Sequence, residues 1–63
     1  MCLSTAYKNE MSDDTAIMEN VMLVECDEGK VILTDLFGVK NEIDGTLLKA
    51  SLTDGYVIIK VND

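Results

Sequence analysis

The residue best suited to chemistry in this sequence is Cys2, which directly follows the initiator methionine. Methionine is normally removed when the second residue is small, and its removal leaves Cys2 with a free α-amine beside its thiol. The amine nitrogen and the thiolate sulfur can then chelate a borderline-soft divalent metal in a five-membered ring. Nickel(II) and copper(II) accept such mixed nitrogen and sulfur ligands, especially in square-planar geometry. Packing in an edge strand is the alternative that remains open for Cys2.

A complete site of this kind requires two copies of Cys2, because one chain supplies only one thiol near its start. A twofold axis in a homodimer would bring the two copies together. The other cysteine, Cys26, falls on the predicted inward face of a strand, where a free cysteine packs as a small hydrophobic residue. We therefore predict the metal site at Cys2 and a core position for Cys26.

The other reactive side chains do not form a catalytic set. The sequence contains no histidine, which is the commonest general base, and it has neither a Cys-x-x-Cys motif nor a glycine-rich phosphate loop. Most carboxylates fall in expected turns, where aspartate bonds to its own backbone. The chain is therefore predicted not to be an enzyme.

The charge balance argues against nucleic acid as a partner. Acidic residues outnumber basic ones by 12 to 5, for a formal net charge of −7. Binding to a phosphate backbone depends on clustered basic side chains, whereas the basic residues here are isolated lysines and arginine is absent. These lysines are Lys8, Lys30, Lys40, Lys49 and Lys60.

The length of 63 residues predicts a single domain over residues 1–63. A chain of this size buries only roughly 60% of its unfolded surface and commonly needs a metal, a disulfide or a partner subunit. Apolar side chains also remain on the non-core faces of the predicted strands, so a homodimer is expected. These side chains are Leu3, Leu23, Ile32 and Ile58.

The sequence shows neither a signal peptide nor an apolar run approaching the ~20 residues of a membrane span. The two cysteines are interpreted as reduced thiols, which is typical of a cytoplasmic protein.

Regular glycines and alternating apolar residues predict an all-β fold. Gly29, Gly38, Gly45 and Gly55 each close a polar stretch, and Asp-Gly is a strong hairpin signal. The β-rich runs between them predict about six short antiparallel strands in a small, partly closed barrel. The runs are CLSTAY, VMLVEC, KVILTD, VKNEI, TLLKASL and YVIIKV.

Period-2 alternation assigns the inward face of these strands. For residues 13–23 a strand with a bend at Glu19-Asn20 is preferred, although Asp13 or Asp14 could also cap a short helix. In the segment LTDLFG, Asp35 is expected to begin a structural turn, Phe37 to fold toward the core and Gly38 to adopt a left-handed conformation. The predicted inward residues are Met22, Val24, Cys26, Val31, Leu33, Leu48, Ala50, Leu52, Val57, Ile59 and Val61.

The segments MCLSTAY, VMLVECDEGKVILTDLFG and GTLLKASLTDGYVIIK resemble the CooT family, whose members are small nickel-binding accessory proteins of carbon monoxide dehydrogenase maturation. The resemblance spans nearly the whole chain, and its most specific parts are the Met-Cys start and LTDLFG. It implies a homodimer that binds one Ni(II) through Cys2 of each subunit, in the manner of a metallochaperone. Its implied partners are a nickel enzyme or the proteins that mature it.

Two other functions remain as alternatives to nickel binding. Similar sequences have also been labelled predicted RNA-binding proteins, and a structural β domain without a metal function would satisfy the same alternating pattern. The chain has no histidine-rich tail of the kind found in nickel stores, so a one-site carrier is expected rather than a reservoir.

Overall fold

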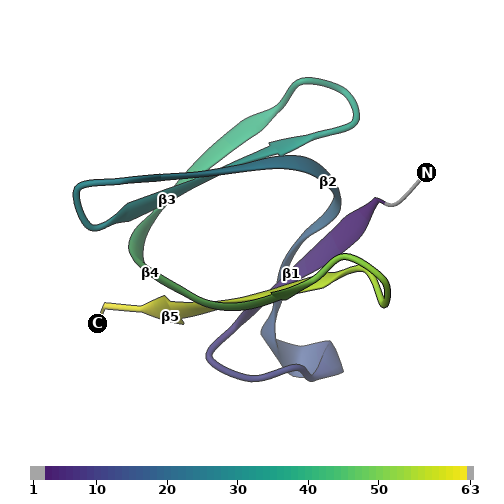
Figure 1. Ribbon diagram of the computed structural model, residues 1–63, viewed down its shortest axis with the longest axis horizontal. Helices are drawn as coiled ribbons and strands as arrows, with labels where there is room; N and C mark the ends of the chain where they lie inside the picture. The colour runs from purple at the N-terminus through teal and green to yellow at the C-terminus, as the bar shows by residue number, and fades with distance from the viewer. Residues whose placement is uncertain (1–2, 63) are drawn as a thin grey trace.

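The computed structural model describes residues 3–62, which form five strands and one short 3-10 helix (Figure 1). The prediction of an all-β fold is confirmed. Within the described range there is no helix with the length and apolar character needed to cross a membrane. The elements are β1 (Ser4–Lys8), η1 (Asp13–Thr15), β2 (Ala16–Asp27), β3 (Lys30–Asp35), β4 (Lys40–Ser51) and β5 (Tyr56–Val61).

The five strands pair in a ring. Each strand is antiparallel to the next along the chain, and β1 closes the ring by pairing in parallel with β5. The parallel pair follows from the odd number of strands, because the first and last of five alternating strands run in the same direction. The small barrel is thus confirmed, but the sequence did not indicate its one parallel pair.

The structure has five strands where about six were predicted, because β4 joins most of the runs VKNEI and TLLKASL into one strand. The expected turn at Asp44-Gly45 does not form. Instead, β4 pairs with β3 as far as Asp44 and with β5 from Gly45 onward. A side chain on Gly45 would collide with the carbonyl oxygen of Lys60 in β5. Glycine at this position therefore permits the close approach of two backbones and does not form a turn.

The other long strand, β2, also changes partner along its length. It pairs with β1 from Ala16 to Val21 and with β3 from Val21 to Asp27. Asn20 has a positive φ of 58°, and the pairing with β3 shifts register just beyond it. The predicted strand with a bend at Glu19-Asn20 is confirmed from Ala16 onward. The alternative, a short helix, is present only as the 3-10 turn Asp13–Thr15, and its cap is Ser12 and not Asp13 or Asp14.

Three of the four expected glycine turns are present, at Gly29, Gly38 and Gly55, and all three residues have positive φ. The β2–β3 hairpin has a two-residue loop in which Glu28 also has positive φ, as a type I′ turn requires. Because this turn matches the right-handed twist of its strands, it fixes the register between β2 and β3.

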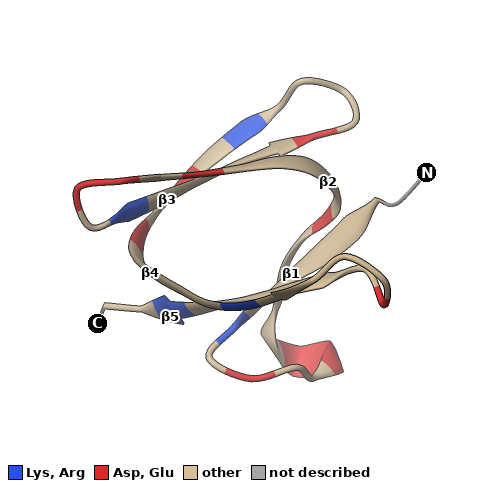
Figure 2. Cartoon of the chain, in the orientation of Figure 1, with Lys and Arg blue, Asp and Glu red and all other residues tan. Residues whose placement is uncertain are grey.

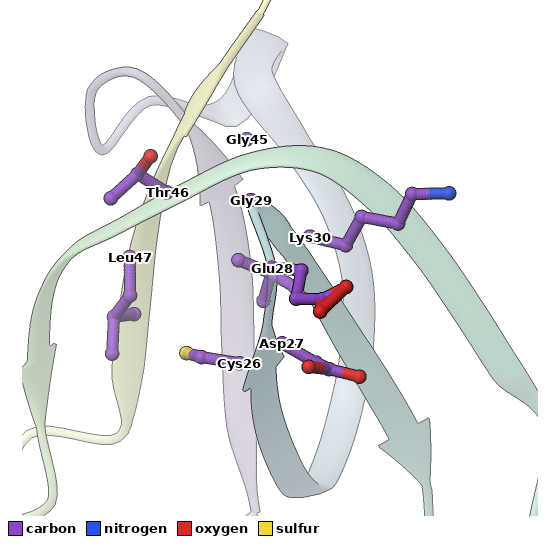
Figure 3. Close-up of a pocket in the computed structure, with 9 residues that line it drawn as sticks. Cys26, Asp27, Glu28, Gly29, Lys30, Gly45, Thr46 and Leu47 are labelled. Carbon is purple, nitrogen blue, oxygen red and sulfur yellow. The ribbon is translucent and has the colours of Figure 1, made fainter.

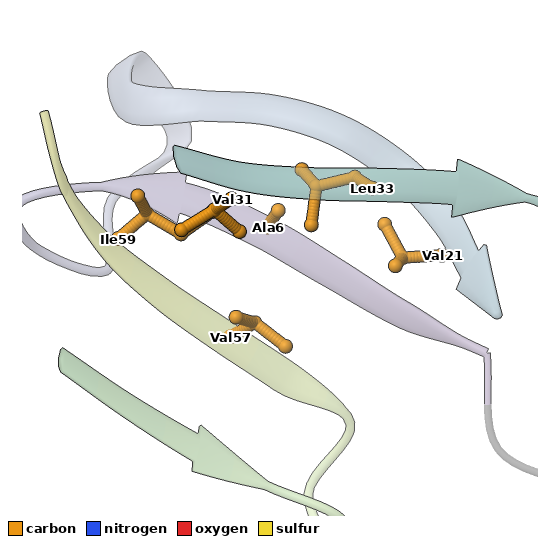
Figure 4. Close-up of a cluster of buried hydrophobic side chains, with 6 residues drawn as sticks. All are labelled: Ala6, Val21, Val31, Leu33, Val57 and Ile59. Atoms are coloured by element: carbon orange, nitrogen blue, oxygen red, sulfur yellow. The ribbon is translucent and has the colours of Figure 1, made fainter. Parts of the chain in front are cut away.

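Among residues 3–62, six hydrophobic side chains are buried inside the ring (Figure 4). The predicted inward positions are confirmed for Val31 and Leu33 on β3 and for Val57 and Ile59 on β5. Val24 and Val61 are partly buried against the same cluster. The buried residues are Ala6, Val21, Val31, Leu33, Val57 and Ile59.

The inward positions predicted on β4 are wrong, since Leu48, Ala50 and Leu52 are exposed. A register shift between Leu47 and Lys49 changes which side chains face the core, and Leu47 packs against it instead. A bulge of this kind adds one residue to a strand, so Leu47 takes the inward position predicted for Leu48. Beyond the bulge, Ala50 pairs with the buried Val57 and lies on the same side of the sheet, but it is exposed because it faces a cavity.

Gly45→Ala is expected to lower the free energy of unfolding by about 2–3 kcal/mol, because either β4 or β5 must move to admit the methyl group. Urea unfolding followed by circular dichroism measures this change. Gly38→Ala serves as the control, because Gly38 has positive φ but open space around it, so only the backbone strain of about 1 kcal/mol applies. Equal losses in the two variants would contradict the close-approach interpretation.

Candidate functional site

The predicted metal ligand, Cys2, lies outside the described residues, and Leu3 is the first residue of known position. Leu3 is 37% exposed and leads into β1 at Ser4. The backbone N–H of Thr5 donates a hydrogen bond to the carbonyl of Gly55 at 3.0 Å. The start of β1 is therefore held against the turn that joins β4 to β5.

The turn between β3 and β4 lies at the same end of the ring (Figure 1). Ser4 pairs with Val21, and the neighbouring Asn20 accepts a hydrogen bond from the N–H of Leu36 at 2.9 Å. We refer to Leu3 together with residues 36–39 and 52–55 as the N-terminal end of the ring. Its exposed apolar side chains include Leu3, Phe37 and Leu52, the last two being 79% exposed.

Asp35 organises the turn in the LTDLFG segment. One carboxylate oxygen, Oδ1, accepts hydrogen bonds from the N–H groups of Phe37 and Val39, both at 2.9 Å. Gly38 has a φ of 85°, so the predicted turn and its left-handed glycine are confirmed. The predicted core position of Phe37 is wrong. These bonds hold the loop beyond the end of the ring of strands, so the aromatic side chain of Phe37 is exposed to solvent.

No three side chains capable of binding a metal come together between residues 3 and 62. At the start of the β3–β4 turn, the carboxylate of Asp35 already accepts two backbone hydrogen bonds through Oδ1. The prediction of a metal site therefore depends on Cys2 and not on a cluster in the described part of the ring.

Cys26 is a free thiol on the surface, so its predicted place in the core is wrong. It lines a cavity of about 360 Å³ beside the β2–β3 turn. Figure 3 shows its sulfur on the side that faces Leu47, whereas the carboxylates of Asp27 and Glu28 point the other way. The three side chains do not converge on a common point, and nothing in this geometry resembles a metal site.

Like the first cavity, a second one of about 270 Å³ is lined by residues of β2 and β4, including Leu47. Met22 and Val24 of β2 line it from one side, and Ala50 of β4 and Leu52 line it from the other. We call the two cavities together the open corner of the ring. The alternation of Met22, Val24 and Cys26 correctly indicated a shared face, but the sequence did not show that this face lacks a covering strand.

Comparison with known proteins gives consistent results. The family model described as "CO dehydrogenase accessory protein CooT" matches residues 1–60. The chain is 38% identical over 60 residues to the uncharacterized protein MJ1551 of Methanocaldococcus jannaschii, covering 95% of this chain and 98% of the relative.

A crystal structure of a protein provisionally designated CooT, from Carboxydothermus hydrogenoformans, has the same fold, with a TM-score of 0.82. The match covers 98% of this chain and 100% of the other at 19% sequence identity. The resemblance identified from the sequence is confirmed by the family match, and the fold by the structural match.

The exposure of Cys26 predicts rapid reaction of its thiol with Ellman's reagent in the native protein. In a Cys2→Ser variant, where Cys26 is the only thiol, the native rate is expected within about tenfold of the rate in urea, because accessibility governs thiol reactivity. Absorbance at stopped-flow times measures both rates. Strong protection in the native state would show that Cys26 is covered in solution.

Proposed function

Since the chain belongs to the family of the CO dehydrogenase accessory protein CooT, we propose that it binds one Ni(II) per homodimer through Cys2 of each subunit. A member of this family is an accessory protein and not an enzyme, and it serves the maturation of carbon monoxide dehydrogenase. The observation that carries the proposal is the family match, which begins at residue 1 and therefore includes Met1-Cys2.

The chemistry of Cys2 suits this role. Two thiolates from two subunits supply soft anionic ligands, and the freed α-amines or adjacent backbone amides supply nitrogens, a combination that nickel(II) accepts. Each ligand must lose a proton before it binds, so metal uptake releases protons and weakens as the pH falls. With one such cysteine per chain, the site is incomplete in a monomer.

The N-terminal end is the surface that a dimer with paired Cys2 residues would bury. Leu3 follows Cys2 directly, and Phe37 and Leu52 project from the two turns beside it. Covering such side chains contributes roughly 1.5–3 kcal/mol each when burial is complete, before the costs of association. Because the core of the ring is small, this additional burial would contribute a large part of the protein's stability.

The charge distribution supports a protein partner over RNA. Acidic residues outnumber lysines by 12 to 5 and give a net charge of −7. Figure 2 shows lysines of β1, β4 and β5 near one another at the lower side of the ring, whereas acidic residues occupy the two upper strands, the turns and the 3-10 helix. Lys30 is further occupied by an ion pair with Glu42 at 3.4 Å. The proposed recipient is accordingly a nickel enzyme or one of its maturation proteins, and the proposed location is the cytoplasm.

Isothermal titration calorimetry with Ni(II) tests the metal site directly, after mass spectrometry has established whether Met1 is present. The native protein is expected to bind one nickel per two chains, and Cys2→Ser is expected to abolish binding because it removes both sulfur ligands. Cys26→Ser is the matched control and should bind as the native protein does. Unchanged nickel binding by Cys2→Ser would refute the proposal.

Sedimentation velocity tests whether the protein is a homodimer and whether the N-terminal end forms the dimer interface. At micromolar concentration the native chain is expected to sediment as a dimer, and Phe37→Glu to weaken association by about tenfold or more, because it buries a charge at the interface. Met11→Glu is the control, since Met11 is an exposed methionine outside the N-terminal end. A monomeric native protein would contradict the dimer, and an equal effect of both variants would contradict its placement.

A further inference from the structure

One edge of β2 has no neighbouring strand in the structure as described. From Met22 to Asp27, β2 pairs with β3 alone. Asp27 and Lys30 flank the two-residue turn, so they form a hydrogen-bonded pair. Because antiparallel pairs alternate between bonded and non-bonded positions, Val24 and Cys26 direct their N–H and C=O groups away from β3. These groups are available to an added strand.

The free edge of β2 lies along a groove in the open corner. Beyond Gly45, β4 pairs with β5 alone and forms the opposite side of that groove. The groove is mostly apolar and extends from Ser4 to the β2–β3 turn, through cavities of about 270 and 360 Å³. Its principal apolar residues are Met22, Val24, Leu47, Ala50 and Val57.

This edge lacks the usual protection against pairing. Natural proteins guard exposed edges with lysine, proline or inward-pointing charges. The sequence of β2 contains neither lysine nor proline. Its side chains along the groove from Met22 onward are Met22, Val24 and Cys26, followed by Asp27 at the turn, whose carboxylate points away from Leu47 (Figure 3). An unguarded edge beside an apolar groove is the arrangement by which sheets accept an extended peptide.

Charge distinguishes between the candidate occupants of the groove. Glu25, Asp27 and Glu28 lie along β2 and its turn, and the nearest lysine, Lys30, is paired with Glu42. A second copy of the chain would bring a further net charge of −7 to this acidic surface. An extended segment with basic residues complements it, and opposite charge also favours encounter.

We propose that the open corner binds an extended, basic segment of a partner protein as an added strand on β2. The segment places alternate aliphatic side chains in the groove and lysine or arginine beside Asp27 and Glu28. Binding at this groove does not require the nickel site. Its use in metal transfer rests on the function proposed above, since one end of the groove lies at Ser4, two residues after Cys2.

The test uses a capped seven-residue peptide of alternating valine and threonine that ends in two lysines. The peptide is titrated into the uniformly ¹⁵N-labelled protein in the absence of nickel. The amide signals of Val24 and Cys26 are expected to shift and to gain protection from hydrogen exchange. Two control peptides carry either glutamate in place of lysine or N-methyl groups on alternate amides. Both are expected to bind at least about tenfold more weakly, because the first loses charge complementarity and the second loses strand hydrogen bonds.

Two matched variants locate the binding site. Met22→Gln removes an apolar contact in the groove and is expected to weaken binding about fivefold, whereas Leu23→Gln on the opposite face of the same strand should change it less than about twofold. No shift at about 1 mM peptide, shifts confined to other strands, or equal effects of both variants would overturn the proposal. Dissociation of the dimer by Met22→Gln would also overturn it, since a second copy would then occupy the groove.

Discussion

The structure depends on two long strands, β2 and β4, that each pair with different neighbours along their two halves. A strand can do this only if its backbone bends sharply at the point of exchange. In β4 the exchange occurs at Gly45, where the absence of a side chain lets the strand approach Lys60 closely. In β2 it occurs beside Asn20, whose positive φ bends the chain. Five strands can therefore close into a ring.

The same bends explain the open corner. Because the second halves of β2 and β4 each have a partner on one side only, an apolar face remains accessible between them in the described ring. Met22 and Cys26 occupy strand positions that would be buried in a fully covered sheet, yet Met22 is 60% exposed. The described residues include only six buried hydrophobic side chains, a small core, so surfaces of this kind matter for association as well as for stability.

The two ends of the ring differ in their chemistry. The start of β1 is held by a hydrogen bond between Thr5 and Gly55 of the β4–β5 turn, so Leu3 lies at a defined end of the ring. Apolar turns surround that end, whereas the acidic β2–β3 hairpin projects from the other (Figure 2). The proposed metal site and the proposed peptide groove therefore fall on different parts of the surface.

The sequence by itself determined the strand content, three of the glycine turns and the side chains that face inward on β3 and β5. These features are local, since they follow from φ preferences and from period-2 alternation within one strand. The Met-Cys start and LTDLFG also identified the family. Only the tertiary structure decided that Gly45 lies within a strand, because the reason is a contact with Lys60, 15 positions along the chain. Likewise, whether Cys26 and Phe37 are covered depends on strands that pack, or fail to pack, against them, and alternation within one strand carries no information about its neighbours.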